Sequence, residues 1–317
     1  MKILAVDDDP EFLALFENTL SNLGYSNVTY VASAAEALAK ISNVQSPFEC
    51  FILDIQMPDM NGIELCQAIR ATPQHANTPI VMNTVMTDRG HIDQAFAAGA
   101  TDYLTKPIDE IEINARLGVM HTLVLERIQL KRALENAGSD PFATPSYRFS
   151  DHIPMHQVSG TIEYIALKNY LKTLGMFRVL STKALGIHVI NGQQLYEEAG
   201  AAIFGEVMSD VAACIADCLK RHQRMFSYAG NGNFTCLVTR MANIDTYELA
   251  EQLRLSIAKL GYIYGELNIN LPIVAVGPVV SCKVKHVMSP DRILETAIED
   301  AQSSARHYSS YAQSFAI

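Results

Sequence analysis

The sequence predicts an α/β protein of two domains, and three features of the chain lead to this prediction. Over the first 121 residues, short apolar segments alternate strictly with amphipathic segments, which is typical of a doubly wound sheet of five parallel strands. Residues 136–147, NAGSDPFATPSY, are rich in Gly, Ser and Pro and predict a linker. The segments beyond the linker lose that alternation and predict an α+β domain with a mixed or antiparallel sheet. A chain of 317 residues is long enough for two such domains.

The first domain is expected to contain five strand–helix pairs in order. The strands are expected at residues 2–6, 27–31, 50–55, 79–84 and 102–105. The helices are expected at residues 10–24, 33–42, 61–71 and 88–100, and a long final helix begins at about residue 109. Local signals support these boundaries, because Pro10 suits the first turn of a helix and Ser33 is a good N-cap.

Polar side chains stand at the carboxyl ends of the expected strands, where ligands bind in such sheets. The first strand ends at Asp7 and Asp8, the third at Asp54, the fourth at Thr84 and the fifth at Lys106. Carboxylates gathered at one sheet edge repel one another and need a cation. Hard oxygen ligands with room for water favour Mg²⁺. The sequence therefore predicts a site of carboxylates, a hydroxyl and a lysine at this edge.

The segments that carry these residues resemble a known family. VDDDP, ILDIQMPDMNG, NT and YLTKP are similar to the receiver domain of two-component response regulators, over about residues 1–121. The resemblance implies a flavodoxin-like fold in which Asp54 accepts a phosphoryl group and Lys106 pairs with that group. Thr84 would be the switch hydroxyl and Tyr103 the aromatic side chain that moves with it. The implied partner is a sensor histidine kinase or a phosphotransfer protein.

The same resemblance implies Mg²⁺ as the cofactor. Asp8 and Asp54 would bind the ion together with the backbone carbonyl of Gln56, and Asp7 would help through water. Attack of the Asp54 carboxylate on a phosphohistidine or a small phosphodonor would be helped by the charge of the ion. The new phosphoryl charge would then draw the switch residues into a second arrangement.

The second domain is expected to be built around a β-hairpin. Helices are expected at residues 159–175, 201–221, 245–261 and 289–308, and strands at 185–190, 224–229, 234–240 and 272–280. The turn of the hairpin is GNGN, residues 230–233, which is a strong hairpin signal. This order resembles the GGDEF domain, a nucleotidyl-cyclase-like fold, over about residues 155–310. The segments GEVMSDVAACIADCLKR, IVAVG and EDAQSSAR, and Phe234 after the turn, carry the resemblance.

The residues that the GGDEF family needs for catalysis are missing. The family turn is Gly-Gly-Asp/Glu-Glu-Phe, whereas residues 230–234 contain no acid. Asn191 stands near the place of a second metal-binding carboxylate, and Arg224 replaces the acid of the inhibitory product site. A neutral amide cannot offset the charge of two Mg²⁺ ions between triphosphates. We therefore expect no catalytic activity in the output domain and no nucleotide cofactor, and the only expected chemistry is Mg²⁺-dependent autophosphorylation of the receiver.

The predicted function is that of a response regulator in a two-component phosphorelay, whose inactive GGDEF-like domain acts by contact on an unknown protein partner. One alternative is a sensor of a nucleotide or of cyclic di-GMP, because Asn side chains can hydrogen-bond a base. Another alternative is an active diguanylate cyclase.

The expected division is a receiver domain at residues 1–121, an extended helix and linker at residues 122–150, and the output domain at residues 151–317. The final receiver helix is expected to continue to about Ala137 with a second apolar stripe that includes Leu130 and Leu134. An exposed apolar stripe needs to be covered. The second domain of the same chain could cover it, and so could a second copy; we expect a homodimer.

The composition limits the possible partners. Hydrophobic residues make up 49% and charged residues 18%, which indicates a folded globular protein. The net charge of -10 opposes binding to nucleic acid and to anionic membranes. We expect no apolar run long enough to span a membrane and no metal site among the cysteines. The expected protein is cytoplasmic, with no nucleic-acid or membrane partner.

Overall fold

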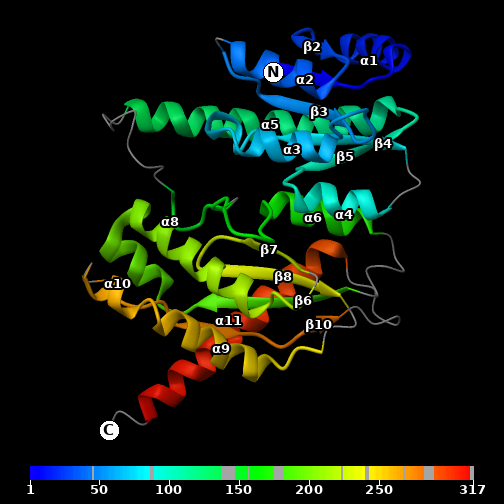
Figure 1. The fold of residues 1–317 in the computed structure, drawn as a ribbon. Coiled ribbons are helices and arrows are strands. Elements are labelled where there is room, and N and C mark those ends of the chain that lie inside the picture. The colour runs from blue at the N-terminus through cyan, green and yellow to red at the C-terminus, as the bar shows by residue number, and fades with distance from the viewer. Residues whose placement is uncertain are drawn as a thin grey trace. The chain divides into compact units, whose positions relative to one another are not determined.

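In a computed structural model, the chain folds as two compact units, Met1–Pro141 and Phe142–Ile317 (Figure 1). The structure describes residues 1–44, 46–85, 89–136, 147–155, 157–174, 182–222, 224–239, 243–266, 269–281 and 289–314. Each unit has its own sheet and its own apolar core.

The first unit contains a sheet of five parallel strands, and this confirms the predicted fold class. The strands are β1 (Ile3–Val6), β2 (Val28–Val31), β3 (Cys50–Asp54), β4 (Ile80–Val85) and β5 (Asp102–Lys106). They lie in the order β2-β1-β3-β4-β5, and every neighbouring pair is parallel. From β1 the chain crosses first to β2 on one side and then to β3 on the other, so the strand order reverses between β1 and β3. Ligands bind at this point in such sheets. Val6 pairs with Leu53, so Asp7 and Asp54 follow at the same level.

Helices cover both faces of this sheet. Helices α1 (Pro10–Asn22) and α5 (Glu110–Asn136) pack on one face. Helices α2 (Ala34–Asn43), α3 (Gly62–Arg70) and α4 (Arg89–Ala97) pack on the other, and a 3₁₀ turn (Pro73–His75) precedes β4. The helix starts follow their sequence signals, because Asp9, Ser33 and Asn61 each cap a helix with the side chain. Asn61 also forms a capping box with Glu64.

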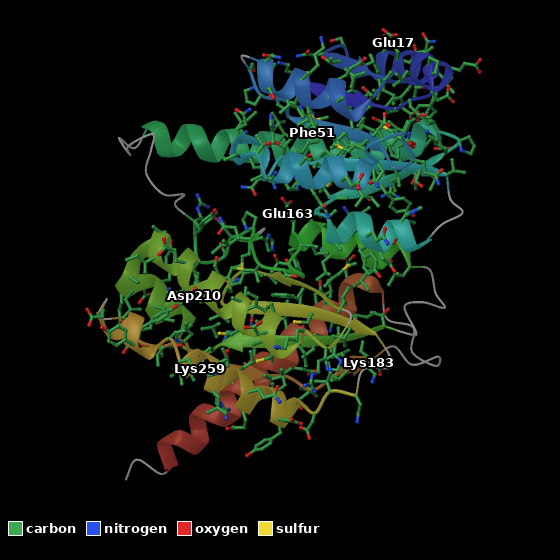
Figure 2. All side chains as sticks on the ribbon, in the orientation of Figure 1. Glu17, Phe51, Glu163, Lys183, Asp210 and Lys259 are labelled. Carbon is green, nitrogen blue, oxygen red and sulfur yellow. The ribbon has the colours of Figure 1, made fainter. Side chains whose placement is uncertain are left out.

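The alternation of side chains along the strands divides the core into two layers. Phe51 and Leu53 of β3 face helices α2 to α4, whereas Cys50 and Ile52 face α1 and α5. Every residue of β3 is buried. Figure 2 shows Phe51 inside the first unit and the exposed Glu17 at its periphery. A fully buried strand holds its end, Asp54, in a fixed place.

Helix α5 is longer than its contact with the sheet requires. Its buried side chains are Ile113, Leu117, Met120 and Val124. They form one of the apolar stripes that the sequence predicts, and the helix continues to Asn136. Leu130 and Leu134 of the second stripe fall outside the side chains that the structure describes.

The second unit contains a sheet of five strands in which every neighbouring pair is antiparallel. The strands are β6 (Thr182–Val189), β7 (Arg224–Tyr228), β8 (Asn233–Thr239), β9 (Val274–Val276) and β10 (Val280–Ser281). Their order is β10-β6-β8-β7, and β9 also pairs with β6. Strands β7 and β8 form the predicted hairpin, with Tyr228 opposite Phe234.

Several element boundaries differ from the sequence-based expectation. The strand expected at residues 272–280 is divided into β9 and β10, because Pro278 lacks the N–H that a continuous ladder needs. Helix α8 (Gly192–Cys218) is divided at Gly200, which is non-helical with φ 79°. The part after Gly200 is the helix expected at residues 201–221, and the part before it was not predicted. The remaining helices are α6 (Tyr164–Thr173), α9 (Thr246–Ala258), α10 (Gly261–Glu266) and α11 (Pro290–Ser314). The sequence analysis did not separate α10 from α9.

Helix α8 also corrects one expectation about apolar runs. By length and composition alone it could cross a membrane, and 50% of its apolar window is buried inside the unit. The core helix of a globular unit passes the same test, and Phe204, Val211 and Ile215 of α8 belong to the core of the second unit.

Candidate functional site

The carboxyl ends of β1, β3 and β5 bring two carboxylates and one amine together in the first unit. The Lys106 Nζ lies 2.8 Å from Oδ2 of Asp7 and 2.7 Å from Oδ1 of Asp54. Asp7 is 2% exposed and Asp54 is 3% exposed, so both charges are held away from water. The Lys106 Nζ also lies over the ring of Phe12 on α1, 4.3 Å from the ring centroid. These contacts place the residues predicted from the strand ends in one site.

Burial dominates the electrostatics of the two carboxylates. It raises the pKa of Asp54 to about 6, and the repulsion of Asp7 adds to the effect of burial, while the hydrogen bond from Lys106 opposes it. Burial also raises the pKa of Asp7. Burial would lower the pKa of Lys106, but the two carboxylates outweigh burial and raise it. The site therefore holds excess negative charge that one lysine does not fully compensate.

A third carboxylate completes an acidic cluster that fits a hard cation. Asp7, Asp8 and Asp54 each offer one oxygen, and these oxygens lie within 4.8 Å of one another. Asp8 is exposed, which leaves room for water on one side. Asn83 at the end of β4 lies beside the cluster, with Nδ2 3.5 Å from Oδ2 of Asp7. Its buried Oδ1 has no hydrogen-bond partner among the described residues, as expected for a group that bonds a water at a metal site.

Two further predicted residues lie on the neighbouring strands. Thr84 is buried at the end of β4, and its hydroxyl donates to the carbonyl of Val85 at 3.3 Å. Asp54 pairs with Asn83, so Thr84 lies one residue beyond that level on the adjacent strand. Gln56 follows β3, and its backbone N–H bonds the Asp54 carboxylate.

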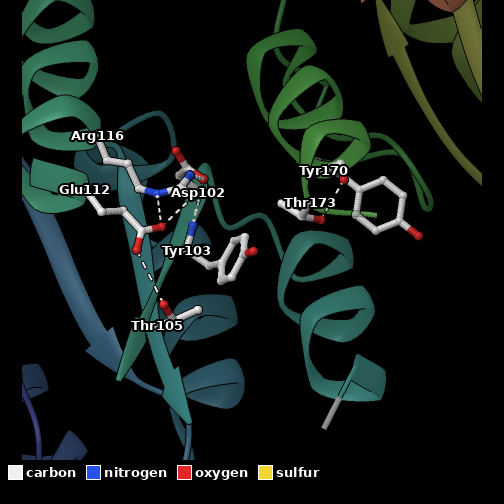
Figure 3. A network of polar contacts seen from close by, with 7 residues as sticks. All are labelled: Asp102, Tyr103, Thr105, Glu112, Arg116, Tyr170 and Thr173. Carbon is white, nitrogen blue, oxygen red and sulfur yellow. Dashed lines mark hydrogen bonds and ion pairs between the residues drawn. The ribbon is translucent and has the colours of Figure 1, made fainter. Parts of the chain in front are cut away.

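Tyr103 belongs to a polar network on β5 and α5 (Figure 3). Its ring faces the guanidinium of Arg116, whose Cζ is 5.0 Å from the ring centroid. Arg116 is held by the buried Asp102 at 2.5 Å and by Glu112 at 2.8 Å (Figure 3). Glu112 also accepts from the hydroxyl of Thr105. The network ties the predicted switch aromatic to helix α5.

Asn83, Asp102 and Arg116 were not among the site residues predicted from the sequence. Asn83 had a usable signal, because it directly precedes Thr84 at the end of a buried strand. Asp102 and Arg116 had no such sequence signal, because their ion pair forms only in the folded chain. A cavity of about 300 Å³ also begins beside the site. It is lined by Ile55, Gln56, Asn61, Ile63, Glu64, Gln67, His91 and Gln94.

In the second unit, amides occupy the positions at which the GGDEF resemblance implies acids. Asn233 is buried, and its Nδ2 donates to the carbonyls of Gly230 and Asn231 at 2.9 and 3.2 Å. Its Oδ1 lies 2.8 Å from Nδ1 of His188. Asn191 bonds backbone groups with both ends of its amide, at 2.9 and 2.8 Å. Both amides therefore form hydrogen bonds within the unit through their nitrogen and their oxygen.

The turn itself needs residues that tolerate positive φ. Gly230, Asn231 and Gly232 have φ of 78°, 53° and 72°. The turn therefore uses this conformation at three successive residues.

A parallel α/β sheet with an acidic cluster and a lysine at its carboxyl edge defines a class of phosphoryl-handling domains, and comparisons with known proteins agree. Residues 3–118 match the family described as the response regulator receiver domain. Chemotaxis protein CheY1 of Helicobacter pylori is 32% identical over 120 residues, which cover 38% of this chain and 96% of that protein. The chain therefore belongs to the response regulator receiver family, and its first unit is a receiver domain of two-component signalling.

Other relatives share only this part of the chain. Protein RcaC of Microchaete diplosiphon is 33% identical over 135 residues, which cover 43% of this chain and 19% of that protein. Signal transduction histidine-protein kinase BarA of Escherichia coli is 36% identical over 110 residues, which cover 35% of this chain and 12% of that protein. A solved structure of Vibrio cholerae chemotaxis protein CheY4 is 35% identical and covers 38% of this chain and 97% of that chain, with a TM-score of 0.35.

Proposed function

We propose that the protein is a cytoplasmic response regulator that accepts a phosphoryl group on Asp54 and passes the signal to another protein through its second unit. The observation that carries this proposal is the position of Lys106, whose Nζ lies within hydrogen-bond distance of both Asp7 and Asp54. The donor would be a sensor histidine kinase or a phosphotransfer protein, as is usual for receiver domains.

The chemistry follows from the residues at the site. Mg²⁺ would be held by Asp7, Asp8, Asp54 and the backbone carbonyl of Gln56, and would supply positive charge to the transferred phosphoryl group. The Asp54 carboxylate attacks the phosphorus, the bond from phosphorus to the donor breaks, and its electron pair leaves with the donor. Lys106 then pairs with the new phosphoryl charge and releases the contact that it makes with the unmodified carboxylate.

The readout uses the neighbouring strands. The Thr84 hydroxyl, which now bonds only the carbonyl of Val85 among the described contacts, is available to turn toward a phosphoryl oxygen. Thr84 pairs with Thr105 on β5, and the Thr105 hydroxyl bonds Glu112 on α5. Tyr103 on the same strand faces Arg116 on α5. Helix α5 leads directly into the linker, so it is the proposed route from the site to the second unit.

Removal of the metal is expected to stop phosphorylation. Incubation of the full chain with a small phosphodonor and Mg²⁺ should give one phosphoryl adduct by intact-mass measurement. Excess EDTA should abolish the adduct, because the buried carboxylates would repel the incoming phosphoryl group. Adduct formation at an unchanged rate in EDTA would contradict the proposed metal-assisted step.

We further propose that the second unit is a GGDEF-like domain without cyclase activity. The antiparallel sheet with its hairpin supports the resemblance, and the hydrogen bonds made by Asn191 and Asn233 support the loss of metal binding. No carboxylate replaces these amides in the turn at residues 230–233.

Incubation of the chain with GTP and Mg²⁺ is expected to give no cyclic di-GMP, with or without a phosphodonor, because two metal ions would lack carboxylate ligands. Chromatography of the products tests this, and calorimetry with GTP and cyclic di-GMP tests the sensor alternative. Formation of cyclic di-GMP that is lost on substitution of Asn233 would contradict the proposal. Micromolar binding of GTP or cyclic di-GMP without turnover would favour the sensor.

The proposed assembly is a homodimer that pairs through α5. Val119 and Leu125 on this helix are 44% and 45% exposed, so part of its apolar surface is uncovered within the first unit. Replacing Leu130 and Leu134 together with Glu should convert a dimer into a folded monomer, as measured by light scattering. Gln129→Glu, at an exposed position of the same helix, is the control and should stay dimeric. Wild type that is monomeric well above micromolar concentration would reject the dimer.

A further inference from the structure

The hairpin turn of the second unit is covered by a segment of the same chain. This segment, Tyr147–Asp151, is called the strap below. It is the first described stretch after helix α5, and residues 137–146 connect the two. The surface that receives the strap is called the turn face. It consists of Gly192, Tyr196, Phe204 and Gly205 of α8 and residues 230–232 of the turn.

Two backbone carbonyls of the strap accept hydrogen bonds from the turn face. The N–H of Asn231 donates to the carbonyl of Phe149 at 2.8 Å. The hydroxyl of Tyr196 donates to the carbonyl of Tyr147 at 2.9 Å. The strap is also shaped by a local turn, in which the N–H of Arg148 bonds the Asp151 side chain. The backbone carbonyls of Tyr147 and Phe149 therefore hold the strap in place, whatever their side chains contribute.

The side chains of the same two residues pack beside two glycines of α8. A side-chain carbon at Gly192 would lie 3.5 Å from the Phe149 ring, and one at Gly205 would lie 3.7 Å from the Tyr147 ring. The Phe149 ring also packs against the rings of Tyr196 and Phe204, at centroid distances of 5.8 and 5.6 Å. Both rings therefore pack against α8 at ordinary van der Waals distance.

The strap packs most tightly against the turn at Gly230. A side-chain carbon at Gly230 would stand 2.3 Å from the carbonyl oxygen of Ser150. The Phe149 ring also lies over Gly232, where a side-chain carbon would be 3.8 Å from it. The strap therefore occupies the surface of the turn that a nucleotide or a protein partner would have to reach.

The strap differs from the core sequence that follows it. Tyr147 and Phe149 are only partly buried against the core, and Arg148 and Ser150 are exposed. Ile153 and Met155, by contrast, are buried members of the core. The strap can therefore leave the turn face while Ile153 and Met155 stay in the core. A displacement transmitted along residues 137–146 would reach the strap before it reached the core.

We propose that the turn face is a docking surface for a Tyr-x-Phe segment, and that the strap is its resident, releasable occupant. The turn becomes accessible to other molecules only when the strap leaves. This proposal does not depend on phosphorylation of Asp54 or on the relation to the GGDEF family.

Residue-resolved amide hydrogen exchange on the full chain tests the proposal. Phe149→Ala should raise the exchange rate of the Asn231 amide about tenfold, because the strap holds the only described acceptor of that N–H. Tyr196→Phe should act in the same direction, since it removes one hydroxyl and keeps the ring. Arg148→Ala is the matched control in the same segment and should leave the rate unchanged. The amide of Asn233, which bonds the Gly230 carbonyl within the hairpin, should stay protected in every variant.

A peptide with the sequence SYRFSDH, residues 146–152, provides the second measurement. Added to the Phe149→Ala chain, it should restore protection of the Asn231 amide, whereas SYRASDH should not. Unchanged exchange at Asn231 in Phe149→Ala would overturn the proposal, and so would a failure of the peptide to protect. A rise at Asn233 equal to that at Asn231 would also overturn it, because the strap would then be an inseparable part of the hairpin.

Discussion

Asp54→Asn is expected to leave the chain without any phosphoryl adduct after incubation with a phosphodonor and Mg²⁺. The amide is close in size to the carboxylate and can still accept from Lys106, so the site should keep its shape. It lacks the charge and the nucleophilic oxygen that the transfer requires. Intact-mass measurement and peptide mapping should locate the wild-type adduct on Asp54 and find none in the variant.

Asp59→Asn is the matched control, because it makes the same chemical change in the loop after β3. Asp59 is exposed and has φ 64°, a conformation that Asn tolerates as well as Asp, so labelling should be unchanged. Labelling that persists in Asp54→Asn would reject the assignment of the phosphoacceptor. Loss of labelling in both variants would point to the loop instead of the Asp54 carboxylate.

The pH dependence of labelling provides an independent check on the nucleophile. The pKa of Asp54 is raised by burial to about 6, so protonation removes the reactive carboxylate as the pH falls below about 6. Because this pKa lies above the ordinary value of 3.8, the Asp54 contribution to stability is present below about pH 4 and is lost as the pH rises through about 6. Mg²⁺ competes with the proton, so the midpoint of the labelling rate should move to lower pH as Mg²⁺ increases.

Most of the receiver site could be predicted from sequence because ligands bind at the carboxyl ends of the strands in a parallel sheet. Parallel strands deliver their carboxyl ends to one edge, so Asp7, Asp54 and Lys106 had to meet once the alternation of strands and helices was recognised. The rule does not say which side chains are desolvated or which neighbours join from the side. For that reason the raised pKa of Asp54 emerged only from the folded chain. The same holds for the Asn83 oxygen, which has no hydrogen-bond partner among the described residues.

The second unit was less predictable because its sheet is antiparallel and its boundaries depend on tertiary contacts. The hairpin was evident from its Gly-Asn turn, since that signal is local. The start of α8 at Gly192 and the break between β9 and β10 were not. Gly277 beside that break receives helix α11, and a side-chain carbon there would lie 2.7 Å from the N of Ala301. Such a close approach leaves no periodic pattern in the sequence.

Gly186→Ala is expected to destabilise the second unit while leaving the receiver intact. Gly186 lies in the middle of β6 and pairs with Thr235 of β8. A side-chain carbon there would stand 1.9 Å from the carbonyl oxygen of Ala297 and 3.0 Å from Cβ of Ala301 on α11. A backbone oxygen cannot yield unless the whole helix moves, so the cost should be about 3 kcal/mol. Urea unfolding followed by amide exchange in β6 and β8 measures this cost.

Gly265→Ala in α10 is the control for this change in the same unit. A side-chain carbon at Gly265 would meet no atom within 4 Å, so this variant should be as stable as wild type or slightly more stable. The Asp54 adduct should form at the wild-type rate in Gly186→Ala, because every residue of the receiver site belongs to the first unit. Protection of β8 that is unchanged in Gly186→Ala would contradict the close packing of α11 on β6. Loss of the adduct together with β8 protection would show that the receiver depends on the second unit, and the phosphoacceptor site would then have to be understood as a property of the whole chain.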